Sequence, residues 1–126
     1  MNSGPVVSET FSRDDRLRKR REFEDCYASG MRVSGRHIQV FLLAGAPGGR
    51  PRLGISVPRR VGGSVERNRV RRRLREIFRR HRSLLPAAAL SLVINARPSA
   101  SAAGFAELLE DYRAGVTRAL SRLPRP

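Results

Sequence analysis

The spacing of apolar side chains predicts a short helix near the N-terminus. In RLRKRREFEDCYASG, residues 16–30, Phe23, Cys26 and Tyr27 recur at i, i+3 and i+4 among charged neighbours. This spacing places all three side chains on one face of an α-helix. Gly30 closes the pattern, as glycine commonly does at helix C-termini. The first predicted element is therefore an amphipathic helix.

The helical period returns twice more along the chain. In GSVERNRVRRRLREIFRRHR, residues 63–82, the predicted buried stripe consists of Val70, Leu74, Ile77 and Phe78. Ser64 is the expected N-cap of this helix, which should end before Pro86. A last helix is predicted from about residue 102 to residue 123. Its apolar positions are Phe105, Leu108, Leu109, Tyr112, Val116 and Leu120.

Three apolar segments are typical of β-strands. They cover residues 37–44, 52–57 and 90–97, and they are rich in Val, Ile, Leu and Phe between Gly- and Pro-containing stretches. The turn composition of residues 46–51 predicts that the first two strands pair as a hairpin. The segment MRV, residues 31–33, indicates a short additional strand before them.

These elements follow the order α-β-β-β-α-β-α. The order predicts an α+β sandwich, with one mostly antiparallel sheet of about four strands and three helices covering it. A chain of 126 residues fits one domain. We expect that domain over residues 16–123, with a flexible N-terminal tail over residues 1–15 and a short C-terminal tail over residues 124–126.

The charge of the chain indicates which class of partner it binds. The chain has 26 basic and 11 acidic residues, a formal net charge of +15, which favours polyanionic partners. Residues 63–82 hold nine arginines against only Glu66 and Glu76. An ordinary solvated helix face mixes charge signs and gains i,i+4 pairs, whereas this one repels itself unless phosphates neutralise it. Pro86 and a strand follow, rather than heptads or a helix-turn-helix, which favours RNA over DNA as the partner.

Catalytic carboxylates are missing where a nuclease would need them. None lies between Asp25 and Glu66, and none lies between Glu76 and Glu107, so the three main predicted strands carry no acid. Metal-dependent phosphodiester cleavage usually relies on carboxylates placed on such strands. The sequence therefore predicts neither a metal site nor a catalytic residue in the protein.

The remaining reactive side chains are isolated. Cys26 is the only cysteine, so an intramolecular disulfide is ruled out, and this suits a reducing cytoplasm. The simplest role for Cys26 is that of a small core residue. His37 is expected at the sheet surface, and His81 as a further phosphate donor. The longest apolar run, residues 87–96, is too short to cross a bilayer. We therefore expect a soluble cytoplasmic protein with no membrane partner.

One long segment resembles a known family. LGISVPRRVGGSVERNRVRRRLREIFR, residues 53–79, is similar to the signature of the protein subunit of bacterial ribonuclease P, where a strand leads into a helix with an RNR core. Here that core is Arg67, Asn68 and Arg69. RLRKRREFEDCYASG resembles the first helix of the family and LVINARPSA its late strand, so the resemblance covers about residues 16–122.

The resemblance implies a subunit of an endoribonuclease that removes the 5′ leader from precursor tRNA. The implied partners are ribonuclease P RNA and precursor tRNA. The RNA subunit would perform the hydrolysis with Mg²⁺ that it mainly holds itself, and the protein would need neither an organic cofactor nor a protein oligomer. The resemblance also implies a ribosomal-protein-like fold with a left-handed βαβ crossover, against the usual right-handed rule.

Two groups of site residues carry over from the family. The residues expected to contact the catalytic RNA are Arg67, Asn68, Arg69, Arg71, Arg72, Arg73 and Arg75. Those expected in a cleft for the single-stranded leader are Phe23, Tyr27, Phe41, Arg36, Arg59 and Arg60. Pro58 replaces the serine of the family and removes one backbone N–H donor.

Two alternatives stay open at the level of sequence. A ribosomal or RNA-chaperone protein of related fold, with no cleavage role, would carry the same basic helix but would not need an aromatic cleft. The aromatic residues themselves fit a core as well as a cleft, because aromatic side chains on amphipathic helices usually face inward.

Overall fold

The computed structural model describes residues 15–45 and 49–123. Their helices and strands follow the predicted order. They are α1 (Arg20–Ser29), β1 (Met31–Ser34), β2 (Ile38–Ala44), β3 (Arg52–Ser56), α2 (Ser64–Arg80), β4 (Leu90–Ala96) and α3 (Phe105–Arg122), with single 3₁₀ turns at Arg59–Val61, Arg82–Leu84 and Pro98–Ser101. The α+β class and the short strand before β2 are confirmed.

The four strands form one mixed sheet in the order β1-β2-β4-β3. β1 and β2 pair antiparallel as the real hairpin of the fold, β2 and β4 pair antiparallel, and β3 and β4 pair parallel. The predicted hairpin between residues 37–44 and 52–57 is therefore wrong, because β4 lies between these strands. β2 and β4 pair over seven residues each, mostly apolar, whereas β3 is shorter, contains Gly54 and takes the edge.

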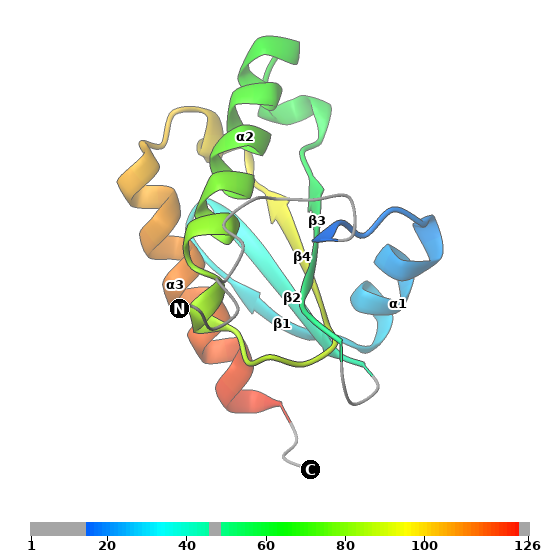
Figure 1. Cartoon of the computed structure of the whole chain (residues 1–126). Coiled ribbons are helices and arrows are strands. Elements are labelled where there is room, and N and C mark those ends of the chain that lie inside the picture. The colour runs from blue at the N-terminus through cyan, green and yellow to red at the C-terminus, as the bar shows by residue number, and fades with distance from the viewer. Residues whose placement is uncertain (1–14, 46–48, 124–126) are drawn as a thin grey trace, which may run out of the picture.

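Helices cover the two faces of the sheet unequally (Figure 1). α2 and α3 lie on one face and bury the larger core, which includes Val70, Leu74 and Tyr112. α1 lies on the other face over a smaller core formed by Leu17, Cys26, Phe41 and Val93. The sheet is thus sandwiched, but one of its faces carries only a ten-residue helix.

The arginine-rich helix forms as the apolar stripe predicts. The four stripe residues are all buried, namely Val70, Leu74, Ile77 and Phe78. The N-cap prediction is wrong by one residue, because Gly63 has the extended N-cap conformation and Ser64 is already helical. Just before it, Gly62 has a φ of 156°, and a Cβ atom there would lie 2.9 Å from Cβ of Glu66, so this position favours glycine.

The N-terminal boundary of the domain also differs from the expectation. Asp15, assigned to the tail by its sequence context, is only 1% exposed. Its carboxylate lies 3.0 Å from Nη2 of Arg82 and 3.3 Å from Nε of Arg50. A buried carboxylate needs such partners, and it anchors the start of the domain to the turn that follows α2. The expectations for residues 1–14 and 124–126 lie outside the described residues.

Candidate nucleic-acid interface

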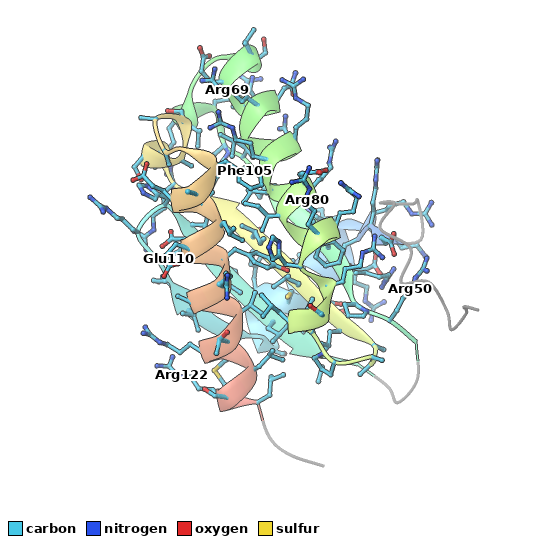
Figure 2. The ribbon with its side chains drawn as sticks, turned by 60° about the vertical axis from the view of Figure 1, so that its left-hand side comes forward. Arg50, Arg69, Arg80, Phe105, Glu110 and Arg122 are labelled. Carbon is cyan, nitrogen blue, oxygen red and sulfur yellow. The ribbon has the colours of Figure 1, made fainter. Side chains whose placement is uncertain are left out.

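α2 carries its arginines on the surface outside the buried stripe. Asn68 and Arg72 are exposed, whereas the other expected contacts are half-buried, namely Arg67, Arg69, Arg71, Arg73 and Arg75. Figure 2 shows basic side chains along α2 from Arg69, near its N-terminal end, to Arg80. The structure therefore gathers all seven predicted RNA contacts on one helix, with the most exposed pair one turn apart.

Among the described residues, the ion pairs of this helix lie in its C-terminal part. Glu76 pairs with Arg79 and with Nε of Arg80 at 2.6 Å. The hydrogen bond from Arg79, followed by that from Arg80, lowers the pKa of Glu76 to about 2, so this pairing persists at neutral pH. The N-terminal turns have no such pairing among the ion pairs of the described residues, and the positive charge is concentrated there.

Not every arginine of α2 is equally available. Nη1 of Arg73 donates to the carbonyl oxygen of Ala103 at 2.9 Å, which ties α2 to the start of α3. Nη1 of Arg71 donates to Oδ1 of Asn68 at 2.9 Å. Arg73 therefore stabilises the packing of α2 against α3, whereas Asn68 and Arg71 form a hydrogen-bonded pair on the surface of α2.

The same surface includes an apolar side chain that the sequence did not single out. Val65 is 69% exposed at the first turn of α2. It lines an open hollow of about 370 Å³ together with Asn68, Arg71, Arg72 and Arg75. An isolated exposed valine is unremarkable, but its place among arginines makes the hollow amphipathic. The sequence signal for the exposure of Val65 is its position on α2, because Val65 lies outside the buried apolar stripe of that helix.

The aromatic residues of the predicted cleft do come together, although not equally exposed. The rings of Tyr27 and Phe41 meet edge to face, with centroids 4.9 Å apart. Phe41 is 8% exposed and belongs to the core under α1, whereas Tyr27 is 40% exposed. The hydroxyl of Tyr27 donates to Oδ1 of Asn95 at 2.8 Å. Of these two residues of the predicted cleft, Tyr27 therefore presents an exposed ring, and Phe41 packs against it from the core.

Phe23 is half-buried and lies against the edge strand. A Cβ atom placed on Gly54 would come within 2.6 Å of Cζ of Phe23, so the ring fits only because residue 54 has no side chain. The helix that carries Phe23 is fastened nearby. Glu22 pairs with Arg52 of β3 and accepts the backbone N–H groups of Arg18 and Lys19. Although burial alone would raise the pKa of Glu22, these hydrogen bonds lower it, which keeps the carboxylate charged.

Beyond α1, a row of polar residues crosses the whole sheet. Ser34 pairs with Gln39, Gln39 with Asn95, and Asn95 with Ser56, so one residue of each strand stands in line. Side chains alternate along strands, and this row therefore points to the same face as Phe41 and Val93, the face that α1 covers only partly. Sequence reasoning missed the row because it depends on the strand register. Tyr27 borders it through Asn95.

The arginines expected in the cleft are divided between two places. Arg59 and Arg60 are exposed in the 3₁₀ turn that follows β3, just beyond Ser56 in the polar row. Arg36 lies in the β1–β2 turn, where its backbone N–H donates to Oδ1 of Asp111 at 3.2 Å. It lines a hollow with His37, Glu107 and Asp111 beside α3, apart from the hollow that Phe23 lines.

The other reactive side chains have structural surroundings. Burial raises the pKa of the Cys26 thiol to about 11, and its S–H donates to the carbonyl oxygen of Phe41, which confirms a core role. His37 is buried rather than at the sheet surface, because Nδ1 bonds Ser99 Oγ at 2.8 Å and Asp111 holds its backbone.

Within residues 15–45 and 49–123, no three His, Cys, Asp or Glu side chains come together as metal ligands. In the same residues no helix is long and apolar enough to cross a membrane.

The fold and this distribution of charge define a small, basic α+β protein with an arginine-rich helix and a polar row on one face of its sheet. The sequence model of the family described as Ribonuclease P matches residues 11–120. The chain belongs to the ribonuclease P protein family.

Individual relatives agree with this assignment. The ribonuclease P protein component of Acidothermus cellulolyticus is 43% identical over 100 residues, covering 77% of this chain and 81% of the relative. That of a Nocardioides species is 43% identical over 105 residues, covering 82% and 89%. Among solved structures, the Staphylococcus aureus RNase P protein superposes with a TM-score of 0.74 at 27% identity, covering 83% of this chain and 94% of that one. The Thermotoga maritima protein gives 0.71 at 30% identity, covering 82% and 96%.

Proposed function

We propose that this protein is the subunit of ribonuclease P that binds the catalytic RNA through α2 and the 5′ leader of precursor tRNA across the α1 side of the sheet. In this role it aids the endonucleolytic removal of the leader during tRNA maturation. The observation that carries the proposal is the polar row across the sheet, bordered by the exposed ring of Tyr27, in a member of this family.

The α2 surface suits the backbone of a folded RNA. Each arginine that neutralises an RNA phosphate releases condensed counterions, and this release increases the affinity of the protein for RNA. The proposed contacts are Arg67, Asn68, Arg69, Arg71, Arg72, Arg73 and Arg75, of which Arg73 contributes mainly by holding α2 against α3. Val65 adds an apolar contact for a sugar or base at the same surface.

The sheet face suits a single strand. Bases stack on aromatic rings whatever their identity, and Tyr27 offers such a ring beside the amide groups of Gln39 and Asn95. Arg59 and Arg60 lie beyond the end of the polar row, where they would meet leader phosphates. Phe23 closes the opposite side against Gly54.

The chemistry in this proposal belongs to the RNA partner. Mg²⁺ would be held mainly by ribonuclease P RNA. The protein binds and orients the two RNAs and screens the repulsion between their phosphates. It acts in the cytoplasm, without an organic cofactor, a membrane partner or a required protein oligomer.

Direct binding tests both surfaces separately. We expect Arg72→Gln to weaken binding to ribonuclease P RNA and to reduce the slope of log K against log salt by about 0.7–0.9, one phosphate contact. The matched change Arg118→Gln, on the outer face of α3, should leave the slope unchanged. Precursor tRNA should bind the wild-type holoenzyme more tightly than mature tRNA does. A protein that bound neither RNA, or bound both tRNAs equally, would contradict the proposal.

A further inference from the structure

An apolar hollow lies at the end of the sheet where β3 and β4 begin. It measures about 270 Å³, and its wall includes residues 50–51, just before β3, and residues 86–87, just before β4. Because β3 and β4 run parallel, this end of the sheet is opposite the turn that carries Arg59 and Arg60. None of the described residues that line the hollow belongs to either proposed RNA surface.

The wall of this hollow is mostly apolar, and its charged residues are basic. The apolar side chains that line it are Pro51, Phe78, Leu85, Pro86 and Ala87. Arg50, Arg82 and Ser83 complete the wall. A cavity of about 150 Å³ in a protein core can hold benzene, so this hollow has room for a phenyl ring. Its chemistry suits an aromatic side chain with carboxylates close by.

The described part of the chain begins beside this hollow. Asp15 is the first described residue, and its carboxylate lies 3.0 Å from Arg82 and 3.3 Å from Arg50, both of which line the hollow. Since Asp14 is bonded to Asp15, the segment that precedes the described residues starts next to the hollow.

The sequence of that segment complements the hollow. Phe11 is the only aromatic residue among residues 1–14, and it precedes Asp15 by four positions. Four residues of extended chain span at most about 14 Å, which keeps Phe11 within reach of the side chains that Asp15 contacts. Residues 9–15 contain three acids and one basic residue, so the segment is net negative in a chain whose net charge is +15. An aromatic ring with negative neighbours matches an apolar wall that contains two arginines.

We propose that residues 9–14 dock in this hollow, with the ring of Phe11 against Phe78, Leu85 and Ala87. Docking removes the ring from water, which favours the docked state about tenfold or more. It also brings the carboxylates of the segment toward Arg50, and it fastens the N-terminal segment to the turn that follows α2. The hollow lies apart from the proposed RNA surfaces, so this inference goes beyond the proposed function and is tested without RNA.

Methyl NMR of the full-length protein tests the contact directly. In a deuterated chain with protonated Phe rings and labelled Leu and Ala methyl groups, we expect nuclear Overhauser effects from the Phe11 ring to Leu85 and Ala87. These effects are assigned by their loss in Phe11→Ala. The control is Val6→Ala, which shortens an apolar side chain outside residues 9–14 and should keep them. If no effect to Leu85 or Ala87 depended on Phe11, the proposal would be overturned.

A second copy of the chain is the competing occupant of the hollow. Mixing labelled with unlabelled protein separates effects within one chain from effects between chains. We expect the Phe11 effects to arise within one chain. Effects that arose only between chains would overturn intramolecular docking, because the segment of a neighbouring copy would then fill the hollow.

Proteolysis of the tail provides a second readout with variants on the receiving side. Ala87→Glu places a negative charge in the wall, which repels the acidic segment while its sequence stays unchanged. We expect a glutamate-specific protease to cleave after Glu9 about tenfold faster in Ala87→Glu than in the wild type, with the product identified by mass spectrometry. Ala114→Glu adds the same charge at an exposed position of α3 and should be cleaved like the wild type. Equal rates in all three proteins would overturn the proposal.

Discussion

The ring of Phe23 rests on the backbone of Gly54, where a Cβ atom would approach Cζ to 2.6 Å and Cε2 to 2.8 Å. This contact joins α1 to the edge strand and sets one wall of the proposed leader cleft. It also explains why β3 carries a glycine in the middle of a strand, where glycine ordinarily weakens the sheet.

Gly54→Ala should therefore displace the Phe23 ring. We expect a loss of about 1–2 kcal/mol in the free energy of unfolding, typical of overpacking, and a selective loss of affinity for precursor tRNA. Urea denaturation and holoenzyme binding with precursor and mature tRNA check the two effects. Ser56→Ala, on the same face of the same strand, is the control for stability. Unchanged precursor affinity would mean that the ring position does not matter to the leader.

Tyr27 allows the ring and the hydroxyl to be separated. Tyr27→Ala removes the proposed stacking surface and should weaken leader-dependent binding by about 1–3 kcal/mol. Tyr27→Phe keeps the ring but removes the hydrogen bond to Asn95, which should cost about 0.5–1.5 kcal/mol of stability and leave most of the leader affinity. If both variants lost leader affinity equally, the hydroxyl network rather than stacking would be the basis of recognition.

The buried carboxylate of Asp15 should matter more than its position near the N-terminus suggests. Asp15→Asn removes the buried negative charge that contacts Arg82 and Arg50, and we expect a loss of about 3 kcal/mol in the free energy of unfolding. Asp25→Asn, an exposed position on α1, should change stability by less than about 0.5 kcal/mol. Chemical denaturation of the two variants measures the difference, and equal stabilities would refute the anchoring role.

The Cys26 thiol should be nearly inert in the folded protein. Its pKa is raised from 9.0 to about 11, so at pH 8 the thiolate fraction is about 100-fold below that of an ordinary thiol, and burial slows access further. We expect a thiol-specific disulfide reagent to react at least that much more slowly with native protein than with protein in denaturant. Raising the pH toward 11 should speed the native reaction. Rapid reaction at pH 8 would show that α1 detaches readily from the sheet.

The sequence predicted the elements whose signals are local and periodic. The α2 stripe was predicted correctly because its spacing matches the helical period over several turns, with arginines on the other side. The family resemblance also assigned Tyr27 and Phe41 to one site, and their rings do meet, although only Tyr27 is exposed.

Features that depend on long-range pairing escaped prediction. The turn composition after β2 indicates that the chain reverses, but it does not say whether β3 pairs with β2 or lies one strand further away. The polar row of Ser34, Gln39, Asn95 and Ser56 exists only through the register of three strand pairs. Asp15 looked like a tail residue because its partner Arg82 is 67 positions away.

Reconstitution of cleavage tests the central claim most directly. Labelled precursor tRNA would be incubated at low Mg²⁺ with the protein alone, with a bacterial ribonuclease P RNA alone, and with both. The account predicts no cleavage by the protein alone, weak cleavage by the RNA alone and strong, correctly placed cleavage by the two together. Absence of any enhancement with a well-folded RNA would contradict it and would favour a basic RNA-binding protein of related fold with no part in leader removal.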